Sequence, residues 1–488
     1  MNAATALATL NLGIALPELI LLGGVLIVMV YDLFSKADAT HRTFTLEALG
    51  LITFLTAGFN LFPHFTEPAK TAFGGMFVRD AMGVALKLAI LVAVAFTLIY
   101  SRPYLVARKI YSGEFVMLLL FATLGMMVMV SSNHFVALYM GLEVLALSSY
   151  TMVALNRDSA VSTEAAMKYF ILGALASGLL LYGMSMIYGA TGSLDVAKIA
   201  KTVEYSRAND PLVLFGLIFV VAGLAFKLGA VPFHMWVPDV YHGAPTAMTL
   251  FIGGAPKIAA FGFIMRILAD SLNGATADWQ LMLTLLAAGS IALGNIVAIA
   301  QTNLKRMLAY STISHMGFLL LGILAGTKNG YASGMFYAIS YVMMSIAGFG
   351  IILLLSREGF EADNLDDLKG MNQRSPWVAF LILIIMFSMA GIPPFLGFWA
   401  KLSVLEGALN AGYLKLVVFA VLMSVIGAYY YLRVVKLMYF DAPTDTTPIV
   451  APGFMRTLLA FNVLALLVLG LLPGGLLSVC VSAIQRSL

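Results

Sequence analysis

The chain has 488 residues, of which 61% are hydrophobic and 11% are charged, whereas an ordinary soluble domain carries about 25% charged residues. This composition and a mean hydropathy of +0.96 exclude a water-soluble globular protein and predict a polytopic membrane protein. A single cysteine, Cys480, excludes a disulfide framework, a CxxC zinc site and a cysteine-ligated iron–sulfur cluster within the chain. No glycine-rich phosphate motif follows a strand, and the net charge of +4 does not indicate nucleic-acid binding.

The apolar runs predict an all-α chain with about fourteen membrane-spanning helices joined by short loops. A helix needs about 20 apolar residues to cross a bilayer. No basic residue precedes the first apolar run, so we expect a retained helix and not a cleavable signal. The expected spans are 14–34, 43–62, 80–100, 114–130, 134–155, 163–190, 211–238, 244–270, 280–301, 305–326, 329–355, 376–410, 413–439 and 453–480.

The same runs divide the chain into four parts. We expect a three-helix segment over 1–113, a first half over 114–270, a second half over 280–439 and a last transmembrane helix over 453–480.

Two long spans contain similar proline-rich segments. GAVPFHMW at 229–236 is echoed by GIPPFLGFW at 391–399. Each segment predicts a discontinuous helix, near 211–238 and near 376–410, because proline interrupts the helical hydrogen bonds. Paired broken helices indicate two inverted repeats, and such breaks mark ion paths in transporters.

Lysine and arginine are more frequent in the odd-numbered connections than in the even-numbered ones. Because basic loops stay inside, this bias places both termini on the outer, periplasmic side of a bacterial inner membrane.

Four charged residues lie deep within the expected spans: Glu143, Lys227, Lys257 and Lys401. Each costs about 2.5–3.5 kcal/mol to insert at a helix centre, so four of them call for a functional reason. Burial disfavours the charged form of such a group, whereas an opposite charge nearby restores it. We therefore expect a Glu143–Lys227 pair whose opening releases a proton from Lys227 to Lys257, with Lys401 as the last group of the second half.

Three further residues are candidates to relay protons or to tune the proton path. His234 and His315 titrate near neutral pH or orient water, although His234 beside a helix break is equally suited to capping freed backbone groups. Lys168 suits the entrance of the path, but a helical pair with Glu164 explains it equally well. His242, near the end of its span, is expected to be interfacial.

Purely structural explanations are also open for the charged residues and for other residues of the spans. A buried Glu–Lys pair can simply hold two helices together. We expect Lys87 to extend toward the membrane surface, Arg266 to pair with Asp270 at a helix end, and Tyr429 to Tyr431 to serve as anchors or packing.

At these residues the sequence resembles the antiporter-like membrane subunits of respiratory complex I, the proton-translocating NADH:quinone oxidoreductase. The resembling segments are GLE at 141–143, EAAMKYF at 164–170, KLGAVPFHMWVPDVY at 227–241, LKRMLAYSTISHMG at 304–317 and GIPPFLGFWAK at 391–401.

The resemblance implies roles for individual residues. Glu143 and Lys227 would be the modulating pair, Lys257 and His315 the central relay, and Lys401 the terminal proton group. Three subunits of the family share the pattern. The lack of a long lateral helix after the fourteenth span, and a lysine at 401 where another member has glutamate, favour the member nearest the quinone-reducing arm.

The resemblance also implies that this chain holds no cofactor or metal and has no redox site. NADH, FMN, iron–sulfur clusters and quinone would then belong to partner subunits, and the chain would meet those subunits, lipid, water and protons. Three other functions stay open: a subunit of a multi-component sodium/proton antiporter, a redox enzyme with its own quinone pocket, and a structural scaffold.

Overall fold

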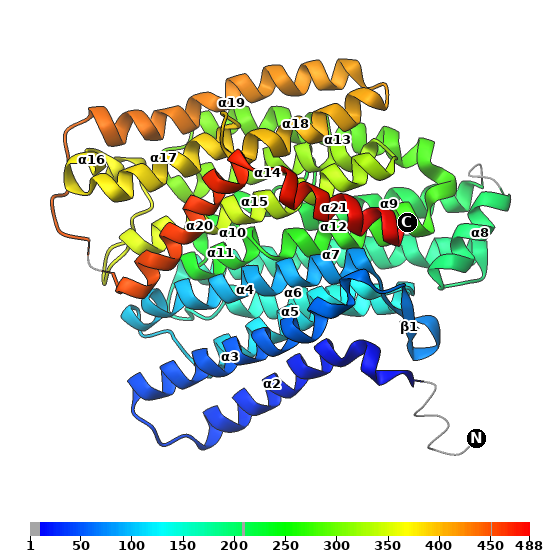
Figure 1. The fold of residues 1–488 in the computed structure, drawn as a ribbon, viewed down its shortest axis with the longest axis horizontal. Helices are drawn as coiled ribbons and strands as arrows, with labels where there is room; N and C mark the ends of the chain where they lie inside the picture. Colours follow the sequence, from blue (N-terminus) through cyan, green and yellow to red (C-terminus); the bar gives the residue numbers. More distant parts are fainter. Residues whose placement is uncertain (1–9, 207–209, 450) are drawn as a thin grey trace.

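A computed structural model describes residues 10–206, 210–449 and 451–488. Its helices lie side by side along one direction, and the described residues contain only one small antiparallel hairpin (Figure 1). Thirteen of the helices in these ranges are long and apolar enough to cross a membrane. The predicted all-α polytopic fold is therefore confirmed.

The N-terminal segment has three long helices, of which α2 and α3 lie at the lower edge in Figure 1. Asp38 and Asp80 accept hydrogen bonds from backbone amides at the starts of the second and third of these helices, which satisfies donors that the first turn leaves free. The elements are η1 (Leu12–Ala15), α2 (Leu16–Phe34), α3 (Ala39–Leu61), η2 (Phe62–Thr66), β1 (Lys70–Ala72), η3 (Phe73–Gly75), β2 (Phe77–Arg79) and α4 (Ala81–Ala107).

The first half begins with two helices packed closely through Gly125 and Gly141, each of which faces backbone of the other helix. The elements are α5 (Gly113–Ser131), α6 (Phe135–Val153), α7 (Ala160–Thr191), α8 (Val196–Ser206), α9 (Pro211–Leu228), α10 (Trp236–Gly243), α11 (Thr246–Gly253), α12 (Pro256–Ile264) and the π-helix η4 (Met265–Ser271).

The second half begins in the same way, with Gly294 and Gly317 at the contact of its first two long helices. The elements are η5 (Asn273–Ala275), α13 (Thr276–Ile299), α14 (Leu304–Leu324), α15 (Lys328–Leu355), η6 (Leu365–Leu368), α16 (Met371–Arg374), α17 (Pro376–Ala390), α18 (Leu396–Asn410) and α19 (Leu414–Phe440); α20 (Gly453–Leu471) and α21 (Gly474–Ser487) follow.

The predicted breaks are confirmed in both halves. The span expected over 211–238 is divided into α9 and α10, and the span over 376–410 into α17 and α18. Each break contains a cis X–Pro peptide bond. Because each half starts with a glycine-packed helix pair and has its fourth span broken, the architecture matches the predicted repeat.

Two spans differ from the prediction. The span over 244–270 is itself interrupted at Gly254, between α11 and α12. The last helix, predicted over 453–480, ends at Leu471, and the separate helix α21 then packs on α4 and α15. Gly470 lies against the backbone around Pro394, and Pro473 follows, so the chain turns there instead of continuing as one helix.

The core lies around α14, α15 and the α11–α12 segment, whose residues are almost all buried. The outer helices α2, α3, α13, α19 and α20 leave large apolar side chains on the surface, such as Phe59 and Val425. This distribution suits a bundle in which lipid or neighbouring subunits cover the outside.

Candidate functional site

The break after α9 frees backbone carbonyls inside the bundle. Gly229 adopts a left-handed conformation with φ of 80°, which glycine tolerates without a Cβ clash, and its amide donates to the carbonyls of Ala225 and Phe226. The indole nitrogen of Trp236 also donates to the carbonyl of Phe226, at 3.0 Å. The carbonyls that follow need other donors.

The ammonium group of Lys257 supplies the donors for the carbonyls of Lys227 and Leu228 at the end of α9. Its ammonium nitrogen lies 2.8 Å from the carbonyl oxygen of Leu228 and 3.4 Å from that of Lys227. The side chain is 1% exposed, and the nitrogen lies 5.4 Å from the centre of the Trp236 ring. The carbonyl end of a helix carries partial negative charge, so this position favours an ammonium group.

The second break, between α17 and α18, has the same geometry. Gly391 is left-handed with φ of 85°, and its amide donates to the carbonyls of Phe387 and Ser388. The ammonium of Lys401 donates to the carbonyl of Ala390 at 2.8 Å and to the Ser424 hydroxyl at 3.0 Å.

Leu228 and Ala390 each precede the left-handed glycine. A lysine therefore binds the equivalent carbonyl in each half, and the structure brings two of the predicted residues to matching positions.

Lys227 lies in the last turn of α9, and its ammonium donates to the hydroxyl of Ser177 on α7 at 3.3 Å. Glu143 lies half-buried on α6, and its Oε1 has no hydrogen-bond partner within the described residues. Across the described ranges, no carboxylate oxygen lies within 4.0 Å of the Lys227 ammonium. The expected Glu143–Lys227 contact is thus not formed in this conformation, and any coupling between them acts over a longer distance.

His315, on α14, is the centre of a second polar cluster. Its Nδ1 lies 2.6 Å from the Tyr337 hydroxyl, and its Nε2 lies 3.2 Å from the Tyr431 hydroxyl. Tyr431 also lies 2.5 Å from the Ser311 hydroxyl. The Lys401 ammonium lies 5.2 Å from the ring centre of Phe318, which stacks on Tyr337 with ring centres 6.3 Å apart. His315, Tyr337, Tyr431 and Ser311 form a hydrogen-bonded unit, and such side-chain networks can accept and pass a proton.

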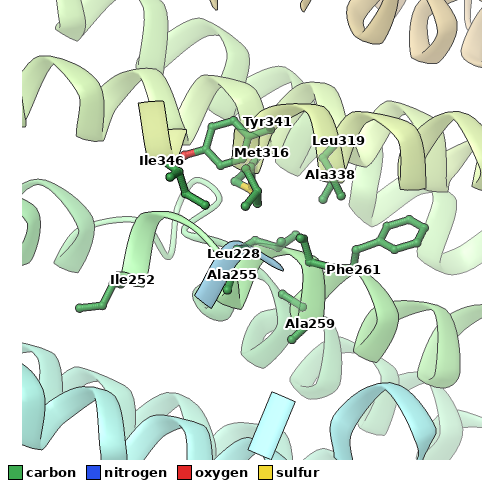
Figure 2. Packing of buried hydrophobic residues seen from close by; sticks show 14 of the residues in the cluster. Leu228, Ile252, Ala255, Ala259, Phe261, Met316, Leu319, Ala338, Tyr341 and Ile346 are labelled. Atoms are coloured by element: carbon green, nitrogen blue, oxygen red, sulfur yellow. The ribbon is translucent and has the colours of Figure 1, made fainter. Parts of the chain in front are cut away.

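Apolar side chains close in sequence to Lys257 and to His315 pack together in the core, and we name this set the apolar layer. Figure 2 shows Leu228, Ala255 and Phe261 on one side and Met316 and Leu319 on the other. All five are at most 1% exposed. No hydrogen bond within the described residues joins Lys257 to His315. The expected relay is therefore two polar clusters that no hydrogen bond joins within the described residues.

A third group of charges lies where α7 meets α10. The Lys168 ammonium pairs with Glu164 at 2.8 Å, as the helical spacing predicts, and with Asp239 at 2.9 Å. Arg306 binds the other oxygen of Asp239 at 3.0 Å. His242 is exposed and lines a pocket of about 130 Å³ together with Glu164, Lys168 and Asp239.

His234, by contrast, joins none of these groups. It lies half-buried at the first break, and its Nδ1 makes no hydrogen bond within the part of the chain that is described.

Sequence reasoning missed several residues of the site. Ser177 and Tyr337 are common residue types without a motif, so nothing in the sequence marks them. Tyr431 was expected to anchor or pack, whereas only Tyr429 is exposed and Tyr431 is buried against His315. Lys305 begins the span expected over 305–326 and was not singled out, but it is 3% exposed and its ammonium donates to the carbonyl of Ala244 at 2.8 Å.

The expectation that Lys87 extends toward the membrane surface is wrong. Lys87 is 1% exposed and lies 2.5 Å from a carboxylate oxygen of Glu18 on α2. Arg266 pairs with Asp270 as expected, at 3.0 Å, and also with Asp80 at 2.7 Å. Among the described residues, no three His, Cys, Asp or Glu side chains are grouped as a metal site would require.

Comparisons with known proteins agree with this architecture. Residues 132–427 match the family model described as NADH:quinone oxidoreductase/Mrp antiporter, TM. The chain is 57% identical over 476 residues to NADH-quinone oxidoreductase subunit N of Nitrosomonas europaea, covering 97% of this chain and 98% of that protein. It is 58% identical over 474 residues to subunit N of Thiobacillus denitrificans, covering 97% of each.

Solved structures show the same fold. A chain of respiratory complex I from Thermus thermophilus with bound aureothin is 30% identical, with a TM-score of 0.81 over 95% of this chain and 98% of that one. A chain of the Mrp complex from Dietzia sp. has a TM-score of 0.83 over 98% and 97% at 22% identity, which is a likeness of fold alone. The protein described here belongs to the family of NADH:quinone oxidoreductase and Mrp antiporter membrane subunits.

Proposed function

We propose that this chain is a proton-translocating membrane subunit of NADH:quinone oxidoreductase, most similar to subunit N. It couples quinone reduction in partner subunits to proton transfer within its own bundle. The observation that carries this proposal is the matched pair of lysines, Lys257 and Lys401, on the freed carbonyls of the two broken helices.

A lysine bound to a helix terminus has two useful states. As an ammonium it makes charge-assisted hydrogen bonds to the carbonyls, and after giving up its proton it holds them more weakly. Because lysine is the basic side chain that releases a proton when desolvated, this geometry provides a switchable proton store in each half. Glu143 and Lys227 are the modulating pair in this scheme, and His315 with its tyrosines is the central group.

No hydrogen bond within the described residues joins Lys257 to His315, so a proton needs water in the apolar layer to pass between them. We propose that transient hydration of this layer gates the transfer, because ordered water joins polar groups that side chains do not bridge. Lys168, Glu164 and Asp239 tune the path at its exposed end. His234, whose Nδ1 has no hydrogen bond within the described residues, is available to orient this water.

NADH, FMN, iron–sulfur clusters and quinone are expected in partner subunits, and this chain carries no redox site in the scheme. We propose that the chain is a multi-pass protein of a bacterial inner membrane with both termini in the periplasm, because its basic loops are expected on the inner side.

The test is Lys227→Ala in the assembled complex in proteoliposomes, with NADH:quinone turnover and proton pumping measured together. We expect both to collapse while the complex stays assembled. If turnover and the proton-to-electron ratio are unchanged, Lys227 is a packing charge. Glu143→Ala, measured in parallel, is expected to weaken both activities less, since the two residues are not in contact.

The likeness of fold to the Mrp complex supports a second candidate, a subunit of a sodium/proton antiporter. Transport by the native assembly that depends on sodium would favour this candidate over the first.

A further inference from the structure

Two cavities lie along one face of the helix α4, apart from the lysines of the two breaks. The first cavity, of about 660 Å³, is bordered by α4, α15, α20 and α21, and its wall includes Val92 and Phe461. The second cavity, of about 640 Å³, is bordered by α3, α4 and the start of α20. Figure 1 shows α4 between α3 and α20 in this part of the bundle. The proposed proton path uses neither cavity.

The two cavities follow one another along a single groove, which we name the α4 groove. On α20, Phe454 lines the second cavity and Phe461 lines the first, and the two residues are seven positions, or about two helical turns, apart. On α4, the wall passes from the first cavity to the second through residues three or four positions apart, which share one face of a helix: Val92, Phe96, Ile99, Pro103 and Val106.

The α4 groove is about as long as a bilayer is thick. Ala85 and Val106 line its two ends on α4, and the helix between positions 85 and 106 rises about 32 Å at 1.5 Å per residue. The hydrocarbon core of a bilayer is about 30 Å thick. The groove therefore matches the depth over which acyl chains extend.

The first cavity has the lining that an acyl chain requires. All of its lining residues are apolar except Thr66 and Asn462. Val92 is 57% exposed, so this wall is open to an occupant from outside the chain. An apolar surface of this kind marks a site of contact with lipid or with another protein.

The second cavity differs from the first because a pair of opposite charges lines it. Nη1 of Arg102 donates a hydrogen bond to Oε2 of Glu47 at 2.6 Å, and both residues belong to the cavity wall. Glu47 is only 8% exposed. Within the described residues, no hydrogen bond reaches its Oε1, and Nε and Nη2 of Arg102 donate none. The cavity thus offers one cation and one anion, each with unused hydrogen-bonding capacity.

We propose that the α4 groove binds a phospholipid whose headgroup carries a phosphate and a primary ammonium group, as in phosphatidylethanolamine. The phosphate accepts hydrogen bonds from Arg102, and the ammonium group donates to Glu47. An acyl chain then follows α4 to Val92, ten residues or about 15 Å from Arg102, which is half the thickness of the hydrocarbon core. A headgroup with only negative charge fits less well, because it would bring a like charge to Glu47.

The test uses the full chain in its assembled complex, reconstituted in vesicles that contain a phospholipid with a photoreactive group in its acyl chain. Phosphatidylethanolamine, phosphatidylcholine and phosphatidylglycerol are compared, and labelled residues are identified by mass spectrometry. We expect phosphatidylethanolamine to label the groove around Val92 about tenfold more than phosphatidylcholine, whose ammonium group has no N–H to donate. This is the scale of one hydrogen bond to a charged group. Equal labelling by the three lipids would overturn the proposal.

Two variants separate the headgroup contact from the groove. Glu47→Gln can still accept a hydrogen bond from Arg102 but lacks the charge that binds an ammonium group, so labelling by phosphatidylethanolamine should fall to the phosphatidylcholine level. Val92→Trp fills the groove and should abolish labelling there. The matched control is Val425→Trp, at a 70% exposed valine of α19 that lines neither cavity, and it should label like wild type. Wild-type labelling of Glu47→Gln or Val92→Trp would overturn the proposal.

A helix of a neighbouring subunit is the competing occupant of the α4 groove. A photo-crosslinking amino acid placed at position 92 distinguishes the two occupants: a product that carries a phospholipid supports the proposal, whereas a product with another polypeptide chain overturns it. Should Glu47→Gln not assemble, the comparison of the three lipids on the unmodified chain still decides the headgroup. None of these measurements depends on turnover or pumping, so their failure is separate from failure of the proposed function.

Discussion

The ammonium nitrogen of Lys257 lies 2.8 Å from the carbonyl oxygen of Leu228, the last residue of a helix that ends inside the bundle. Lys401 binds the carbonyl of Ala390 at the same distance in the second half. Both lysines thus stabilise a break in a helix, and in the proposed scheme each also carries the exchangeable proton. The structural role and the proposed proton-transfer role would then coincide in one contact.

Ser177 is expected to hold the Lys227 ammonium in place. Ser177→Ala removes one hydrogen bond to a charged group, a loss of about 1.5–3 kcal/mol. We expect slower coupled turnover and a shifted pH profile, with normal assembly. Ser185→Ala, an exposed serine on the same helix, is the control and should match wild type. Equal behaviour of the two variants would show that Ser177 does not act on Lys227.

Tyr431 is expected to connect His315 with Ser311. Tyr431→Phe keeps the ring but removes the hydroxyl that lies near both partners, so we expect lower turnover and a stability loss of about 1 kcal/mol. Thermal unfolding and pumping assays measure the two effects. Tyr429→Phe changes an exposed ring two residues earlier and should be neutral. A neutral Tyr431→Phe would contradict the assignment of a proton-passing cluster around His315.

The apolar layer is expected to limit proton leak. Leu319→Ala leaves a cavity in the apolar layer that costs about 2–5 kcal/mol and gives water room there. We predict faster collapse of an imposed pH gradient in resting proteoliposomes. Leu319→Met, which conserves volume, should keep the leak at the wild-type rate. An unchanged leak in Leu319→Ala would place the barrier elsewhere.

Much of this architecture was accessible from the sequence. Hydropathy located the spans, and the proline-rich segments located both breaks, because these features depend on local composition. The separate helix after Leu471 was missed, since a turn at Pro473 within an apolar run is decided by packing against the Pro394 segment.

Some site residues were predicted and others were missed for the same reason, because contacts that depend on packing are not visible in local composition. Lys257 and Lys401 stand out as charges in apolar runs, whereas their carbonyl partners are backbone atoms that no residue type reveals. The partners of His315 come from α15 and α19, and their hydroxyls are recognisable only once three helices are packed. Lys87 was misplaced because its partner, Glu18, lies on a helix distant in sequence.

The most direct test of the central claim is the pair of replacements Lys257→Arg and Lys401→Arg. Arginine can still donate to the freed carbonyls but does not release its proton in proteins. We predict that both variants assemble to wild-type levels and retain the fold, while proton pumping and coupled NADH:quinone turnover are lost. Lys415→Arg, which changes an exposed lysine of α19 with no role in the scheme, should remain active. Full pumping by Lys257→Arg and Lys401→Arg would show that these lysines serve only to cap the broken helices.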